Sequence, residues 1–187
     1  MRHLPNLICL LRIVLIWPIV VALEQAAYER TLLLFFIAAA SDGLDGFLAR
    51  RYHWTSELGK FLDPLSDKLL LVAVFLVATW CGLIPRWLTV AAVARDVMIG
   101  LGALVYRIGW GPLHGRPMIS SKINTLLQIL YVLAVVAYAA FELPPPSIAA
   151  ALQWLILVTV LISGFQYVHE FTRRALEAGT RGQSAAW

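Results

Sequence analysis

Hydrophobic residues occur in this chain in long runs that are separated by short polar or proline-containing segments. The runs cover residues 6–23, 30–51, 59–83, 85–107, 120–141 and 146–167. A helix needs roughly 20 apolar residues to cross the hydrocarbon core of a bilayer, and each run is close to that length. The pattern therefore predicts six transmembrane helices, a turn at residues 144–146 and a C-terminal tail over residues 168–187.

The composition supports an all-α integral membrane protein. Of the 187 residues, 60% are hydrophobic, and the mean hydropathy is +0.78. A soluble domain of this size could not bury so much apolar surface, so we predict a single transmembrane domain over residues 1–187. A cleaved signal peptide is the alternative for the first run. Because the run is long and no clean small-x-small site follows before Glu24, we expect it to be retained.

Positive charge lies mostly at one end of the predicted spans. Twelve Lys and Arg residues fall at one membrane face and two, Arg30 and Arg86, at the other, while Arg95 lies within a span. Positively charged loops stay in the cytoplasm, so we predict cytoplasmic termini and tail, in the inner (cytoplasmic) membrane. The net charge of +4 suits anionic lipids and phosphorylated substrates. Nucleic acid is disfavoured as a partner, because no soluble domain carries a basic groove.

Four aspartates interrupt the apolar pattern between the second and third runs. Asp42 and Asp45 are three residues apart, and Asp63 and Asp67 are four apart, which on a helix puts each pair on one face. Two helices joined by residues 52–58 would bring the pairs face to face. The carboxylates would then need cations among them, and oxygen ligands favour Mg²⁺, Mn²⁺ or Ca²⁺ over zinc. Alternatively, the aspartates could be solvated residues that cap helix ends. This explanation fits Asp42, but it does not fit Asp45, Asp63 and Asp67, which lie within or beside apolar runs.

The same stretch resembles the signature of the CDP-alcohol phosphatidyltransferases, D-x2-D-G-x2-A-R-x8-G-x3-D-x3-D. The matching residues are Asp42, Asp45, Gly46, Ala49, Arg50, Gly59, Asp63 and Asp67. At average residue usage, eight fixed positions match by chance about once in 10¹⁰ starting points. The resemblance covers most of residues 4–128. It implies a bundle of six transmembrane helices of the CDP-alcohol phosphatidyltransferase type.

The resemblance also implies a role for each of these residues. Asp42, Asp45 and Asp63 would hold one or two Mg²⁺ or Mn²⁺ ions, and Asp67 would be the general base that also contacts metal. The CDP group would contact a second set, Asp42, Gly46, Ala49, Arg50 and Gly59. The small members of this set would let the nucleotide approach the helix backbones closely. The implied reaction is attack of an alcohol on the lipid-side phosphorus of CDP-diacylglycerol, with release of CMP.

Two basic residues are candidates for binding a phosphate on the acceptor alcohol. Arg95 lies near the middle of the fourth run, where a charge is costly enough to indicate a function. Lys122 lies near the start of the fifth run, which has a polar face made of Ser120, Ser121, Lys122, Asn124, Thr125 and Gln128. Of these, Ser121, Thr125 and Gln128 are aligned at helical spacing. The alternative for Arg95 is a structural ion pair with Asp96. Adjacent residues point about 100° apart on a helix, which favours pairing of Asp96 with another helix.

The choice of acceptor depends on smaller features of the sequence. Pro5-Asn6 with Arg12 resembles the glycerol branch of the family, which comprises phosphatidylglycerophosphate synthases and CDP-diacylglycerol-dependent cardiolipin synthases. The former usually show R-E, then a second Arg on the same helix, then G-K-x-K-T. This chain has Arg95-Asp96, Ala103 and Ser121-Lys122-Ile123-Asn124-Thr125. These departures favour phosphatidylglycerol as the acceptor, giving cardiolipin, with glycerol 3-phosphate as the alternative.

Two other classes of function compete with this interpretation. A cation transporter could use the aspartates to bind a permeating ion, but they lie at one membrane face and no polar path continues through residues 69–77. A structural scaffold leaves the eight-residue match unexplained. We therefore expect a phospholipid-biosynthetic enzyme whose active site faces the cytoplasm. Its expected partners are CDP-diacylglycerol, the acceptor, membrane lipids and a second copy of the chain in a homodimer.

Overall fold

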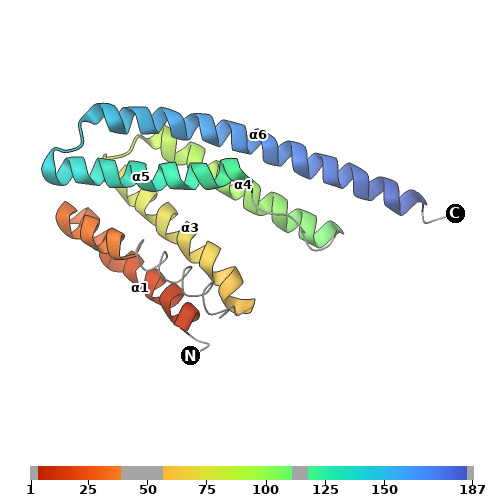
Figure 1. Ribbon diagram of the computed structural model, residues 1–187, viewed down its shortest axis with the longest axis horizontal. Coiled ribbons are helices and arrows are strands. Elements are labelled where there is room, and N and C mark those ends of the chain that lie inside the picture. The colour runs from red at the N-terminus through yellow and green to blue at the C-terminus, as the bar shows by residue number, and fades with distance from the viewer. Residues whose placement is uncertain (1–3, 39–56, 111–117, 185–187) are drawn as a thin grey trace. The chain divides into compact units, whose positions relative to one another are not determined.

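The computed structural model describes residues 4–38, 57–110 and 118–184, and the side chains of residues 12–38, 66, 68–109 and 118–173. Every regular element in these residues is a helix (Figure 1). The helices are α1 (Leu4–Glu24), residues 28–38, α3 (Glu57–Trp80), α4 (Arg86–Trp110), α5 (Ile119–Phe141) and α6 (Pro146–Ser184). The prediction of an all-α protein is confirmed for this part of the chain.

The helix boundaries follow the hydrophobic runs. The ends of α1, α3, α4 and α5 lie within three residues of the predicted ends. The predicted turn at residues 144–146 separates α5 from α6, which begins at Pro146. The helix predicted over residues 30–51 is described only at residues 28–38.

Three of the described helices are long and apolar enough to cross a membrane. The stretches are Arg86–Gly109, Ile119–Phe141 and Pro146–Arg173, and Lys68–Trp80 forms a shorter apolar helix. The prediction of six spans is thus confirmed in part within the described residues.

The last helix extends far beyond the predicted end of its span. α6 has 39 residues and ends at Ser184, so the predicted tail is helical over most of its length. The apolar run ends at Tyr167 because charged residues follow, but the backbone hydrogen bonds of a helix do not require a bilayer. Arg173 Nη2 lies 3.1 Å from Glu170 Oε2. Ion pairs at this i, i+3 spacing support helices exposed to water.

A Schellman motif ends α3 and turns the chain toward α4. Leu83 N–H donates to the Ala78 carbonyl at 2.8 Å, and Gly82 N–H donates to the Thr79 carbonyl at 3.1 Å. Gly82 has a φ of 76°, a left-handed conformation that glycine adopts without steric cost. The last carbonyl groups of the helix are therefore satisfied within a short connection.

The described helices belong to two compact units. Unit 1 is Met1–Arg86 with Ile129–Ala149, and unit 2 is Trp87–Gln128 with Ala150–Trp187. In unit 1, α1 packs on α3, and Phe75 of α3 meets Tyr131 of α5 with ring centroids 6.3 Å apart. The single domain predicted over residues 1–187 stays a prediction.

Unit 2 contains α4, the first part of α5 and most of α6. Trp87 and Trp154 pack with ring centroids 5.9 Å apart, which joins α4 to α6 near one end. Further along, a Cβ atom placed on Gly102 would lie 2.5 Å from Cε2 of Phe171. The absence of a side chain at Gly102 therefore leaves room for the Phe171 ring of α6 against α4.

Candidate active site

The predicted catalytic stretch lies only partly in the described residues. Asp42, Asp45, Gly46, Ala49 and Arg50 lie outside them. Gly59, Asp63 and Asp67 are on α3, which confirms that the second aspartate pair is one turn apart on a single helix. The side chains of these three residues are not among those described. Their assignment to metal, nucleotide and base stays a prediction.

The donor chemistry of the aspartates fits a hard divalent ion. Two carboxylates one helical turn apart offer the oxygen ligands that Mg²⁺ and Mn²⁺ prefer. Among the side chains described in residues 12–38, 66, 68–109 and 118–173, no three His, Cys, Asp or Glu converge. The assignment of the metal ligands to the four aspartates stays a prediction.

A buried arginine reaches the same turn of α3. Arg12 of α1 donates a hydrogen bond from Nη1 to Oγ of Ser66 at 3.3 Å. Ser66 is 0% exposed and Arg12 is 2% exposed. In sequence, Ser66 follows Asp63 by three residues and precedes Asp67 by one. The sequence identified Arg12 only as one of the basic residues at the cytoplasmic face and as part of the pattern that resembles the glycerol branch. Its burial against the acidic turn is a feature that the position in the sequence did not reveal.

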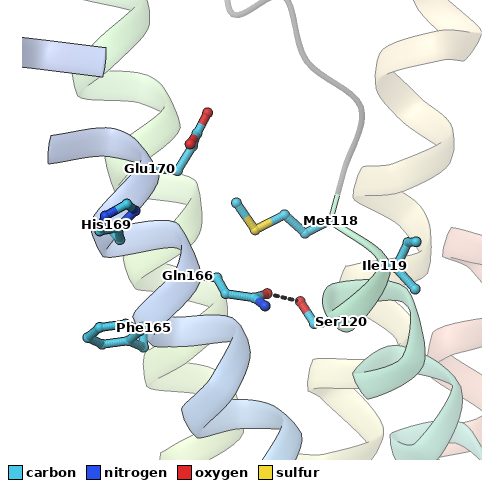
Figure 2. Close-up of a pocket in the computed structure, with 7 residues that line it drawn as sticks. All are labelled: Met118, Ile119, Ser120, Phe165, Gln166, His169 and Glu170. Carbon is cyan, nitrogen blue, oxygen red and sulfur yellow. Dashed lines mark hydrogen bonds between the residues drawn. The ribbon is translucent and has the colours of Figure 1, made fainter. Parts of the chain in front are cut away.

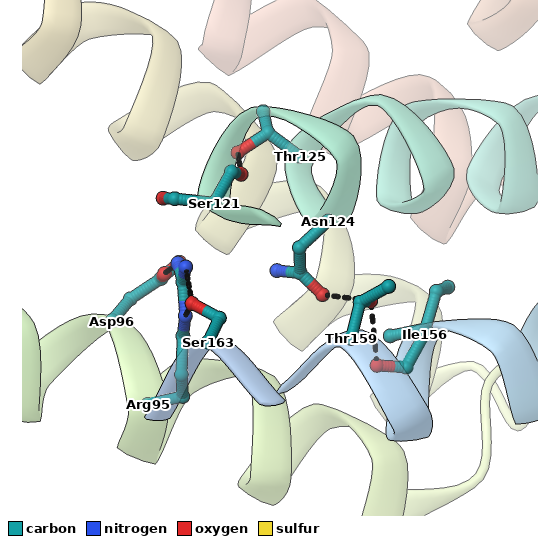
Figure 3. Close-up of polar contacts among 8 residues, drawn as sticks. All are labelled: Arg95, Asp96, Ser121, Asn124, Thr125, Ile156, Thr159 and Ser163. Carbon is teal, nitrogen blue, oxygen red and sulfur yellow. Dashed lines mark hydrogen bonds and ion pairs between the residues drawn. The ribbon is translucent and has the colours of Figure 1, made fainter. Parts of the chain in front are cut away.

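The predicted acceptor residue Arg95 is buried in unit 2 and held by three side chains. Its Nε donates to Ser163 Oγ of α6 at 3.0 Å, and its Nη2 donates to the same oxygen (Figure 3). Nη1 donates to Asp96 Oδ1 at 2.7 Å. The ring centroid of Tyr167, one turn along α6 from Ser163, lies 6.0 Å from the guanidinium carbon, within the range of a cation–π contact. The local ion pair of Arg95 and Asp96, which was the alternative interpretation of the sequence, is therefore formed.

The first turns of α5 carry polar side chains with different surroundings. Lys122 is exposed, whereas Asn124 and Gln128 are buried. The Thr159 hydroxyl of α6 contacts Asn124 Oδ1 at 2.9 Å, and the Thr125 hydroxyl donates to the Ser121 carbonyl at 3.2 Å. The buried polar face of α5 is thus centred on Asn124 and Gln128.

The α6 members of this cluster, Ser163 and Thr159, were not identified from the sequence. A single hydroxyl in an apolar run is an ambiguous signal, because it often bonds the carbonyl of its own helix. Thr79 does so, donating to the Phe75 carbonyl at 2.7 Å. Thr159 also contacts the Ile156 carbonyl of its own helix at 3.0 Å. Only the packing of α4, α5 and α6 in unit 2 shows that Ser163 and Thr159 have partners on other helices.

A groove of about 490 Å³ lies where the start of α5 meets α6 in unit 2. Met118, Ile119 and Ser120 line it from the α5 side, and Phe165, Gln166, His169 and Glu170 from α6 (Figure 2). Ser120 Oγ donates to Gln166 Oε1 at 2.6 Å. The groove thus combines apolar walls with polar groups that can hydrogen-bond a ligand.

These features belong to a multi-pass helical membrane protein with a signature of paired aspartates. Residues 2–165 match the CDP-alcohol phosphatidyltransferase family. The chain belongs to this family, which confirms the resemblance inferred from the eight residues.

The relatives come from both groups of the glycerol branch. The chain is 31% identical to the CDP-diacylglycerol--glycerol-3-phosphate 3-phosphatidyltransferase of Bacillus subtilis, over 89% of this chain and 94% of that protein. It is 29% identical to the cardiolipin synthase (CMP-forming) of Rattus norvegicus, over 89% of this chain and 60% of that protein. It is 31% identical to a probable phosphatidylglycerophosphate synthase of Mycobacterium tuberculosis, over 89% of this chain and 80% of that protein. The similar identities do not separate the two acceptors.

Proposed function

We propose that this enzyme transfers the phosphatidyl group of CDP-diacylglycerol to a hydroxyl of a glycerol-type acceptor and releases CMP. We further propose phosphatidylglycerol as the preferred acceptor, which gives cardiolipin, with glycerol 3-phosphate as the alternative. Family membership and the relatives named above support the reaction class. The surroundings of Arg95 support the choice of acceptor.

The proposed reaction is an in-line displacement at phosphorus. The acceptor oxygen bonds to the lipid-side phosphorus, the bond from that phosphorus to the CMP oxygen breaks, and the hydroxyl proton passes to Asp67. Asp42, Asp45, Asp63 and Asp67 would hold one or two Mg²⁺ or Mn²⁺ ions, which neutralise the diphosphate charge when bound. The CDP group would be held by five residues of the signature: Asp42, Gly46, Ala49, Arg50 and Gly59.

The observation that carries the acceptor proposal is the balance of buried charge in unit 2. Arg95 is the single buried Lys or Arg among the side chains that the structure describes in this unit. Its charge is partly offset by Asp96, 2.7 Å away, and Lys122 is exposed. A phosphodiester carries one negative charge, whereas a phosphate monoester carries nearly two. One partly neutralised guanidinium therefore suits phosphatidylglycerol better than glycerol 3-phosphate.

The setting proposed for the reaction is the inner (cytoplasmic) membrane with the active site facing the cytoplasm. The asymmetry of Lys and Arg along the sequence supports this orientation. We also propose a homodimer as the working form of the enzyme.

The experiment is an acceptor screen with the purified full-length protein. It is incubated with Mg²⁺, CDP-diacylglycerol and, in separate reactions, phosphatidylglycerol, glycerol 3-phosphate, inositol phosphate and serine, and CMP and lipid products are measured. We expect cardiolipin from phosphatidylglycerol, with slower turnover of glycerol 3-phosphate. Product with only serine or inositol phosphate would overturn the glycerol-type assignment. Absence of CMP release with every acceptor would favour a non-enzymatic role such as cation transport.

A further inference from the structure

A polar seam runs between α5 and α6 in unit 2. Its members recur about once per helical turn on facing sides of the two helices: Ser120, Asn124 and Gln128 on α5, and Gln166, Ser163 and Thr159 on α6. Two cross-helix contacts join them, Ser120 with Gln166 at 2.6 Å and Asn124 with Thr159 at 2.9 Å. The seam begins at the groove lined by Ser120 and Gln166. At 1.5 Å per residue, Gln128 lies roughly 12 Å along α5 from Ser120.

The inner part of the seam contains donors without a partner. Among the described residues, Asn124 Nδ2 and Gln128 Nε2 are buried and make no hydrogen bond. Both side chains are almost completely inaccessible, at 0% and 1% exposure. An unpaired amide in an apolar interior costs stability. Two such groups on one face of one helix therefore point to a ligand rather than to a chance defect.

Arg95 adds further donors at the seam. A guanidinium has five N–H groups, and the hydrogen bonds from Arg95 to Ser163 and Asp96 use one N–H on each of its three nitrogens. Each η nitrogen therefore keeps one N–H without a partner among the described residues. In Figure 3 the amide nitrogen of Asn124 points toward Arg95 and Ser163. The buried amide nitrogens of Asn124 and Gln128 and the remaining N–H groups of Arg95 are all donors, so a ligand that satisfies them presents acceptor oxygens.

We propose that the seam binds the polar headgroup of a lipid acceptor that enters from the groove. This inference rests on the proposed function and goes further by naming the headgroup's binding residues. The phosphodiester oxygens would lie beside Arg95, and the amides of Asn124 and Gln128 would donate to phosphodiester or hydroxyl oxygens. The apolar walls of the groove, including Met118 and Phe165, would contact the part of the lipid nearest the acyl chains.

The chemistry of the seam selects for a glycerol phosphodiester. Neutral amide donors stabilise a monoanion and hydroxyl groups without the second full cation that a dianionic monoester favours. A groove with apolar walls also suits a ligand with acyl chains more than a water-soluble phosphate. The proposed ligand is therefore a phosphodiester lipid with free hydroxyls on its headgroup.

The test uses two substitutions that change the amides with little change in shape. Gln128→Met removes the unpaired donor, and Asn124→Asp keeps the oxygen near Thr159 but replaces the amide nitrogen. We expect each to raise the KM for phosphatidylglycerol about tenfold or more, while the KM for CDP-diacylglycerol changes less than about twofold. Thr31→Val is the matched control, because Thr31 is equally buried but bonds its own helix in unit 1 through the Ala27 carbonyl.

The thermal stability of the same variants separates binding from structure. If Gln128 only fills space, Gln128→Met removes an unpaired buried amide, so the Tm stays the same or rises and neither KM changes. That result would overturn the inference and leave the proposed function intact. Equal increases in both KM values would also overturn it. Wild-type protein that uses only glycerol 3-phosphate would contradict the lipid ligand, and wild-type protein that releases no CMP would contradict the proposed function itself.

Discussion

Ser163 Oγ of α6 accepts hydrogen bonds from both Nε and Nη2 of Arg95 on α4. The two nitrogens form one side of the guanidinium, so a single hydroxyl holds that side of the group against α6. With Asp96 at Nη1, this arrangement compensates a charge that is 4% exposed. A charged group in an apolar interior persists only with such partners.

Removal of this hydroxyl should destabilise the protein and weaken acceptor binding. Hydrogen bonds to charged groups contribute about 1.5 to 3 kcal/mol, so Ser163→Ala should lower the free energy of unfolding by about that amount. Unfolding of the detergent-solubilised protein would be followed by heat or denaturant. Ser163→Thr keeps the hydroxyl and should lose much less. Equal stability of the Ala and Thr variants would show that the hydroxyl does not hold Arg95 in place.

The close approach of α4 and α6 gives a second prediction. Gly102→Ala places a Cβ 2.5 Å from Cε2 of Phe171, and overpacking of this kind costs about 1 to 3 kcal/mol. Gly100 lies on the same helix, and a Cβ atom placed on it would meet nothing within 4 Å among the described residues. Gly100→Ala should therefore be neutral or stabilising by up to about 1 kcal/mol, because alanine favours a helix over glycine. Thermal unfolding of both variants checks this, and a stabilised Gly102→Ala would contradict the packing.

The boundaries of α1, α3, α4 and α5 and the start of α6 were predictable because the apolar runs and the proline turn determine them. The sequence singled out Arg95 as a candidate because a charge in such a run is costly, and the structure shows that it is buried with polar partners. Ser163 and Thr159 were not, because a hydroxyl gives the same sequence signal whether it bonds its own helix, as Thr79 does, or another helix. The extension of α6 was not predicted, because hydropathy identifies the part of a helix that lies in the bilayer and gives no signal for a polar continuation.

The contact between Arg12 and Ser66 predicts a structural link between α1 and the acidic turn of α3. Ser66→Ala removes an acceptor for the buried guanidinium and should cost about 1.5 to 3 kcal/mol of stability. Because Ser66 lies between Asp63 and Asp67 in the sequence, we also expect a lower kcat. Unfolding and CMP release are measured on the same preparation. Ser66→Thr serves as the control that retains a hydroxyl, and an unchanged Tm in Ser66→Ala would refute the link.

The aspartates and the metal should be needed for turnover rather than for folding. Loss of a metal ligand or base removes transition-state stabilisation, so Asp63→Asn and Asp67→Asn should each lower kcat about 100-fold or more. Glu29→Gln, at an exposed position of unit 1 that is distant in sequence from the acidic turn of α3, should leave kcat nearly unchanged. Wild-type activity should vanish in EDTA and return with Mg²⁺ or Mn²⁺. Full CMP release in EDTA would end the metal hypothesis.

The two basic residues predicted to bind the acceptor phosphate should differ in their effects. Arg95 is buried and held in place, whereas Lys122 is exposed and its charge is screened by water. Arg95→Gln should therefore raise the KM for the acceptor about tenfold or more, while Lys122→Gln has a smaller effect.

Two further variants make this comparison decisive. Arg95→Lys keeps a charge but cannot bond Ser163 through two nitrogens, so its acceptor KM should lie between the wild-type and Arg95→Gln values. Arg107→Gln neutralises an exposed cation on α4 and should behave like the wild type. If Lys122→Gln raised the acceptor KM more than Arg95→Gln did, the phosphate would be bound at the exposed start of α5. The buried guanidinium would then be a structural element of unit 2 that joins α4 to α6 through Ser163.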